Sequence, residues 1–145
     1  MNTPWYDYFS DGFCKIFYFA GSGNGRIDKI VIFTQMQEPD AYSITLGNLR
    51  LDGSIDVHGT AGDGDAAEIL STVAKVIAFF LVDHPQAAIF IEGTTAARVR
   101  LYQMAIVREL DDLGKYFDIH GFDGSDMEIF QPGRNYLSFT ISLKS

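Results

Sequence analysis

The sequence predicts an α+β domain in which helices pack against a mainly antiparallel sheet. Short runs rich in β-branched and aromatic residues fill most of the first sixty positions, and two later segments repeat apolar residues at helical spacing. Apolar residues make up 47% of the 145-residue chain and aromatic residues 14%, a composition typical of a packed globule. We therefore expect a single α+β domain over residues 1–145.

About four strands are predicted in the N-terminal part. They are the runs CKIFYFAG, DKIVIFTQ and YSITLGNLRL, with SIDVHG as a candidate fourth. The first two runs are separated by GSGNGR, whose glycines suggest a phosphate-binding loop. Such a loop needs a helix directly after the glycines, and here a strand follows. A flexible hairpin loop is therefore expected.

The first predicted helix begins after Asp63 or Asp65, either of which can cap it, and ends before His84-Pro85. Its apolar face is expected to consist of Ala66, Ile69, Leu70, Val73, Ile77, Phe80 and Leu81. Its opposite side is expected to carry Glu68, Ser71, Thr72 and Lys75. The short apolar run AAIFIEG, residues 87–93, then predicts a buried strand.

A second helix is predicted from about Thr95 to Phe117. One face should contain Val99, Tyr102, Ile106, Leu110, Leu113 and Phe117, and the opposite face Arg100, Arg108, Asp111 and Lys115. The remaining runs FDIHGF, MEIFQ and NYLSFTISL predict two or three strands. Between the last pair, QPGRN fits a type II turn centred on Pro132-Gly133, which predicts a C-terminal β-hairpin.

Charge and hydropathy limit the classes of partner. The net charge is −8 and the isoelectric point is near 4.6, so the surface as a whole does not attract nucleic acid or an anionic membrane. The single cysteine, Cys14, excludes an internal disulfide. The N-terminus lacks the pattern of a secretory signal, and the most apolar run, residues 73–82, is too short to span a bilayer. We expect a cytoplasmic protein with no membrane partner.

Two near copies of one pattern, DVHGTAGD from Asp56 and DIHGFDGS from Asp118, raise the hypothesis of a metal or acid–base site. In a strand, the Asp and His of each copy share a face, so two pairs could bind zinc, or Asp could orient His as a general base. Alternatively, both copies are strand ends that run into glycine–aspartate turns. Because no complete ligand motif accompanies them, we expect no metal, no cofactor and no catalytic residue.

The segment EGTTAARVRLYQMAIVREL carries a concentration of positive charge. Three arginines and no acidic residue lie between Thr94 and Arg108, and Thr94 or Thr95 can cap the helix. Helix-start amides together with Arg98 could receive a phosphate or a carboxylate. Alternatively, Arg98 stacks on Tyr102 or pairs with a carboxylate. The candidate binding residues are Thr94, Thr95, Arg98, Arg100, Tyr102 and Arg108.

The stretch GTTAARVRLYQMAI resembles a motif of a family of small uncharacterised bacterial proteins, a domain of unknown function. The resemblance extends over most of the chain, through IDKIVIFTQ, YSITLGNL, STVAKVIAFFL, FDIHGF and PGRNYLSF in that order. It implies a shared fold and a shared surface patch around the arginines, but no reaction. The resemblance includes FDIHGF as a strand, but it does not imply the Asp-x-His-Gly pattern of either copy, which weakens the metal-site hypothesis.

Together these observations favour a non-enzymatic binding domain whose second helix, Thr94–Arg108, contacts another protein. The first alternative is a module for single-stranded nucleic acid, with aromatic strands such as KIFYF for stacking and Arg98, Arg100 and Arg108 for phosphates. A smaller phosphate-bearing ligand is a related alternative. A further alternative is a metal-dependent or acid–base enzyme built on the two Asp-x-His-Gly copies.

Overall fold

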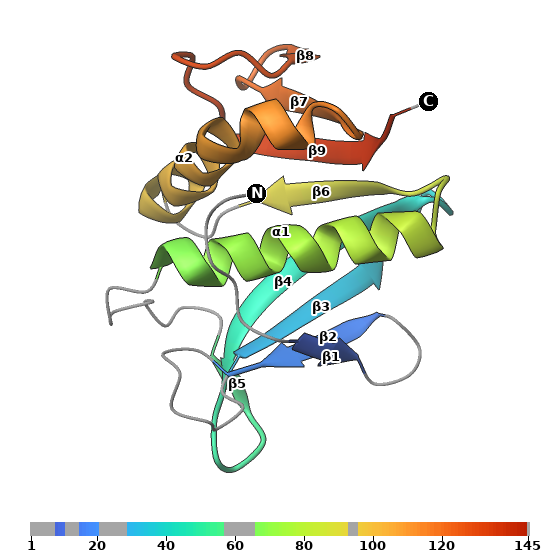
Figure 1. Ribbon diagram of the computed structural model, residues 1–145, viewed down its shortest axis with the longest axis vertical. Helices are drawn as coiled ribbons and strands as arrows, with labels where there is room; N and C mark the ends of the chain where they lie inside the picture. Colours follow the sequence, from blue (N-terminus) through green and yellow to red (C-terminus); the bar gives the residue numbers. More distant parts are fainter. Residues whose placement is uncertain (1–7, 11–14, 21–28, 57–65, 93–95, 145) are drawn as a thin grey trace. The chain divides into compact units, whose positions relative to one another are not determined.

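The structure of the protein, a computed structural model, describes residues 8–10, 15–20, 29–56, 66–92 and 96–144. The chain divides into two compact units, Met1–Thr34 with Ile44–Asp83 and Gln35–Ser43 with His84–Ser145. Both combine strands with one helix, and all but one of the strand pairs whose register is described are antiparallel. The predicted α+β class is confirmed (Figure 1). A single domain over residues 1–145 stays a prediction.

The first unit places its strands in the order β1-β2-β3-β4, with β5 paired to β4. Its elements are β1 (Tyr8–Ser10), β2 (Ile16–Phe19), β3 (Lys29–Gln35), β4 (Ala41–Leu49), β5 (Ile55–Asp56) and α1 (Ala66–Asp83). The antiparallel register of β2 and β3 pairs Phe19 with Lys29, as a hairpin requires. The GSGNGR loop lies outside the described residues. The short strand β1 was not predicted, because three residues are too few to display a period.

The core of the first unit is aromatic. Phe33 of β3 and Phe80 of α1 stack with ring centroids 4.1 Å apart, and Phe17 of β2 meets Phe33 edge to face. The apolar face predicted for α1 is confirmed at Ile69, Val73, Ile77, Phe80 and Leu81, all of which are buried. The helix ends at Asp83, as predicted from the following His84-Pro85. Asp63 and Asp65, the predicted caps, lie outside the described residues.

Two residues on the predicted polar side of α1 were misassigned. Ser71 and Thr72 are buried rather than exposed. The Thr72 hydroxyl donates a 2.7 Å hydrogen bond to the carbonyl oxygen of Glu68 one turn earlier, which meets its polar requirement inside the helix. A small hydroxyl side chain can therefore occupy a core position that the apolar pattern alone assigns to solvent.

The second unit places its strands in the order β4-β6-β9-β7-β8, in which β4 contributes Ala41–Ser43. Its further elements are β6 (Ala88–Glu92), α2 (Ala96–Leu113), β7 (Phe117–Phe122), β8 (Met127–Ile129) and β9 (Ser138–Leu143). Its parallel pair joins β4 to β6, and its other described pairs are antiparallel.

Two details of the second unit correct the sequence analysis. The second helix was expected to reach Phe117, but α2 ends at Leu113 and Phe117 begins β7 as a buried strand residue. The C-terminal hairpin is formed by β7 and β8, not by the last two strands. The turn at Pro132-Gly133 is present, with a φ of 87° at Gly133. The segment that contains it connects β8 to β9, and these two strands lie on opposite sides of β7 in the sheet.

Neither helix in the described part of the chain combines the length and apolar character needed to cross a membrane.

Candidate functional site: a groove beside α2

An open groove of about 690 Å³ runs along α2 in the second unit. One wall is the outer surface of the helix, and the other is the segment between Pro132-Gly133 and β9. The helix contributes Ala96, Val99, Arg100, Gln103, Met104, Val107 and Arg108, and the opposite segment contributes Asn135, Tyr136 and Leu137. No acidic residue lies among these lining residues.

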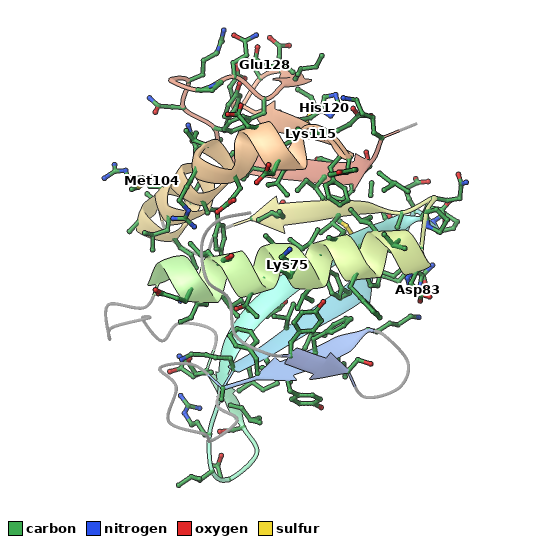
Figure 2. All side chains as sticks on the ribbon, in the orientation of Figure 1. Lys75, Asp83, Met104, Lys115, His120 and Glu128 are labelled. Atoms are coloured by element: carbon green, nitrogen blue, oxygen red, sulfur yellow. The ribbon has the colours of Figure 1, made fainter. Side chains whose placement is uncertain are left out.

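The helix α2 carries apolar side chains on two sides. Those on the inner side are buried, and those on the outer side line the groove. Ile106 and Leu113 are buried on the inner side, as predicted. On the outer side Met104 is 59% exposed and Val107 is 42% exposed, and Figure 2 shows Met104 on the helix surface. Exposed apolar side chains are common singly, but here they share a concave surface with the exposed Leu137, which is typical of a contact site.

Two arginines frame this apolar strip. Arg100 is exposed and makes no side-chain hydrogen bond or ion pair with any residue that the structure describes. Arg108 Nε lies 3.3 Å from Oε1 of Glu109, a carboxylate that is 5% exposed. Arg108 is thus partly neutralised, whereas Arg100 presents its full charge to solvent. Both were predicted as binding residues, and both line the groove.

Arg98 and Tyr102 lie elsewhere on α2 and do not line the groove. Both are half-buried, and the Arg98 guanidinium hydrogen-bonds the Tyr102 hydroxyl. Burial raises the pKa of Tyr102, while the charge and hydrogen bond of Arg98 oppose that rise. This arrangement agrees with the structural role considered for Arg98. Thr94 and Thr95, the predicted helix caps, lie outside the described residues.

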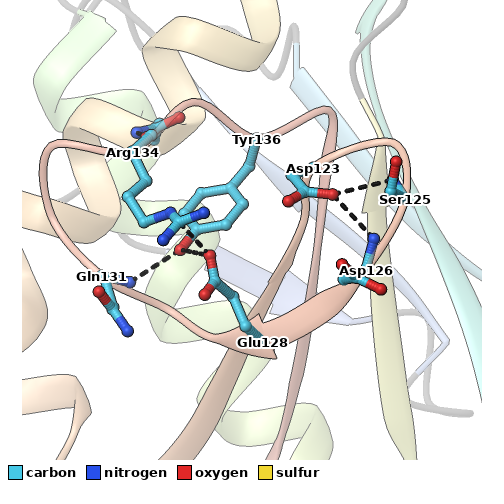
Figure 3. A network of polar contacts seen from close by, with 8 residues as sticks. Asp123, Ser125, Asp126, Glu128, Gln131, Arg134 and Tyr136 are labelled. Atoms are coloured by element: carbon cyan, nitrogen blue, oxygen red, sulfur yellow. Dashed lines mark hydrogen bonds and ion pairs between the residues drawn. The ribbon is translucent and has the colours of Figure 1, made fainter.

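The opposite wall of the groove is held by a polar network around Tyr136 (Figure 3). The buried Tyr136 hydroxyl donates to Glu128 Oε1 at 3.0 Å and accepts the Gln131 amide at 3.1 Å. Arg134 Nε lies 2.9 Å from the same Glu128 oxygen. Burial is the main cause of the raised pKa of Tyr136. The Glu128 carboxylate thus binds both Tyr136 and Arg134, and the Tyr136 hydroxyl also binds the Gln131 amide. These connected contacts hold the wall in a defined position.

Gln103 of α2 joins the two walls, since its side-chain amide donates to the backbone carbonyl of Arg134. Neither Gln103 nor Tyr136 was singled out from the sequence. The stretch PGRNYL was the sequence signal for this wall, but by itself it indicates only a turn and part of the family resemblance. A buried tyrosine after a glycine turn could have suggested an anchored loop.

The second Asp-x-His-Gly copy is part of β7 and its following turn. Asp118 and His120 are half-buried strand residues. Asp123 Oδ1 accepts the backbone amides of Ser125 and Asp126, each at 2.8 Å, as expected for an aspartate turn. These bonds lower the pKa of Asp123, with the amide of Asp126 as the largest cause. The turn hypothesis is thereby confirmed for this copy.

In the first copy only Asp56, in β5, belongs to the described residues, and His58 lies outside them. The described part of the chain contains no group of three His, Cys, Asp or Glu side chains that could hold a metal ion.

The aromatic strand KIFYF was considered for stacking on nucleic-acid bases. Phe17 and Phe19 are each 1% exposed and belong to the core of the first unit. Base stacking needs an exposed ring face, so these two rings are not available for it.

Comparison with family models matches residues 2–144 to a family described as a family of unknown function, DUF6934. Comparisons with curated proteins and with solved structures found no match.

Proposed function

We propose that this chain, which belongs to the DUF6934 family of unknown function, is a non-enzymatic domain that binds another protein in the groove beside α2. The observation that carries the proposal is an exposed apolar strip, Met104, Val107 and Leu137, on a concave surface. Burying such a strip against a partner is favourable at about 25 cal/mol per Å² of apolar surface removed from water.

The construction of the groove also supports a binding role. Its far wall is fixed through Tyr136, and Gln103 ties that wall to α2. A surface that is ordered before its partner arrives loses less conformational entropy on binding. A wall of this kind is therefore better suited to recognition than an unanchored loop.

Single-stranded nucleic acid is a weaker candidate for the occupant of this groove. The described lining residues include one aromatic residue, Tyr136, which is 4% exposed. A base therefore finds no stacking platform here. The net charge of −8 would also reduce the affinity for a polyanion at low ionic strength.

A site-specific crosslinking experiment tests the proposal. A photoreactive amino acid replaces Met104, which lines the groove, or Leu101, which is 41% exposed on α2 outside it. In a lysate of the source cells, we expect a discrete crosslinked protein from position 104 and none of that species from position 101. The protein identified in this way is then purified and its affinity measured by calorimetry.

Met104→Ser should weaken this affinity at least about tenfold, because a buried methionine loses its apolar contact, and Leu101→Ser should leave it unchanged. Equal effects of the two substitutions, or the same crosslinked species from both positions, would contradict binding in the groove.

A further inference from the structure

We infer that the occupant of the groove is an extended acidic segment of the partner, in which two carboxylates flank one apolar side chain on the same face. The inference rests on the proposed function and adds the chemistry, conformation and spacing of the bound segment. Three features of the groove support it, which are its charge, its length and the order of its residues along α2.

The charge of the groove selects an acidic occupant. Among the described residues that line it, Arg100 and Arg108 are the charged ones and none carries a carboxylate, although the whole chain has a net charge of −8. Arg100 has no described side-chain partner, and Arg108 shares only its Nε with Glu109 in the described contacts. Both guanidinium groups therefore have donors available for a carboxylate, which they can bind through two parallel hydrogen bonds.

The length of the groove matches a short extended segment. The lining residues of α2 extend from Ala96 to Arg108, which corresponds to about 18 Å at the helical rise of 1.5 Å per residue. An extended chain covers this length with about six residues at about 3.3 Å per residue, whereas a helix needs about twelve. A segment of about five or six residues therefore reaches both ends of the groove only when it is extended.

The order of the residues along α2 sets the spacing. Met104 lies one turn after Arg100 and one turn before Arg108, so the two arginines are about 12 Å apart along the helix and Met104 is midway. In an extended chain, residues i and i+4 are separated by about 13 Å and share a face with residue i+2. The matching segment is thus acid-x-apolar-x-acid, with the apolar side chain against Met104 and Val107.

Phosphate-bearing polymers match this order less well. They could reach both arginines, but they offer no apolar group for the centre of the groove, where Met104 is 59% exposed. Covering that side chain with a phosphate backbone would leave charged oxygens against apolar surface, which is unfavourable. A peptide satisfies both requirements at once.

A displayed library of random peptides, selected on the full chain at low salt, tests the inference. We expect the enriched sequences to contain two acidic residues at positions i and i+4 with an apolar residue at i+2. For a selected peptide, changing both acids to glutamine should weaken binding by about twofold to thirtyfold, the range for two exposed ion pairs. Moving one acid by a single residue should weaken binding as well, because it turns that side chain to the other face.

A charge exchange gives the sharpest control. Arg100→Glu should weaken the acidic peptide, and replacing one of its two acids by lysine should restore binding to this variant. The acid that restores binding also reveals the direction of the peptide in the groove. Lys115→Glu makes the same change of charge at an exposed position outside the groove and should have no effect. Equal unfolding midpoints of the variants establish that the fold is unchanged.

The outcomes separate the inference from the proposed function. Selected peptides that lose affinity on Met104→Ser but contain no acidic pair, or a pair at another spacing, overturn the inference and leave the binding groove in place. Failure of the charge exchange overturns it in the same way. If no selected peptide depends on Met104, both the groove and its acidic occupant are wrong.

Discussion

Gly121 explains why one of the two Asp-x-His-Gly copies needs its glycine. A Cβ atom at this position would lie 2.4 Å from the ring of Tyr136, closer than any real Cβ contact. The glycine therefore makes room for a buried aromatic ring, and the ring in turn fixes the wall of the α2 groove through Glu128 and Gln131. At this residue, the repeated pattern serves packing rather than ligand binding.

Gly121→Ala should destabilise the protein by about 1–3 kcal/mol, as expected for an extra methyl group in a filled core. Urea denaturation measures the free energy of unfolding. In a Tyr136→Ala background the same substitution should cost clearly less, because the clashing ring is gone. Equal costs in both backgrounds would show that Tyr136 does not set the requirement for glycine.

The hydroxyl of Tyr136 links stability to alkaline pH. Its pKa in the folded state is raised, mainly by burial, so the phenol of the unfolded chain loses its proton first as the pH rises. The contribution of Tyr136 is therefore fully present below about pH 10 and is lost above it. Between pH 8 and pH 11, the free energy of unfolding should fall more in the parent protein than in Tyr136→Phe. Parallel curves for the two proteins would contradict the raised pKa.

Arg98 is expected to act in the structure rather than at a ligand. It is half-buried and hydrogen-bonds Tyr102, so Arg98→Ala should lower the free energy of unfolding by about 1.5–3 kcal/mol. Added phosphate should raise the melting temperature of the parent no more than that of the variant, since a ligand stabilises only a state to which it binds. An unchanged stability together with a lost phosphate response would make Arg98 an anion-binding residue.

At the scale of elements, the periodicity of apolar residues predicted helix features that depend on neighbouring residues. It did not predict features that depend on contacts with distant parts of the chain, such as strand pairing. The apolar face of α1 and its end before Pro85 follow from local spacing, and both are confirmed. The apparent face of the second helix continued through Phe117 by coincidence of period, although the strand β7 begins there. The hairpin predicted for the last two strands is wrong, because β8 pairs with β7, and a turn between two strands does not by itself decide which strands pair.

Two adjacent phenylalanines on α1 test the assignment of its buried face. Phe80 is fully buried and stacks on Phe33, so Phe80→Ala should cost about 3–5 kcal/mol. Phe79 is 47% exposed, but its ring meets Phe17 edge to face, so Phe79→Ala should cost less than Phe80→Ala, about 1–2.5 kcal/mol. Urea denaturation of the two variants compares the same change one residue apart. Similar losses, or a larger loss at Phe79, would mean that the helix is rotated from the described position.

At the scale of the whole molecule, the sequence pointed to the helix that lines the groove but not to the form of the groove. The contrast between the arginines of the second helix and a net charge of −8 already pointed to α2. Arg100 and Arg108 line the groove, whereas Arg98 and Tyr102 do not. The opposite wall lies about thirty residues further along the chain, and its position depends on Gln103, Gly121 and Tyr136. Such long-range contacts leave no periodic signal in the sequence.

The central claim is that the groove beside α2 is the binding surface, and a titration followed by nuclear magnetic resonance tests it most directly. Amide signals of the isotope-labelled full chain are recorded while the crosslinked partner, or the best selected peptide, is added. The largest shifts should cluster at Val99–Arg108 and Asn135–Leu137, and Met104→Ser should abolish them. Shifts confined to the first unit, or to β8 without α2, would contradict it.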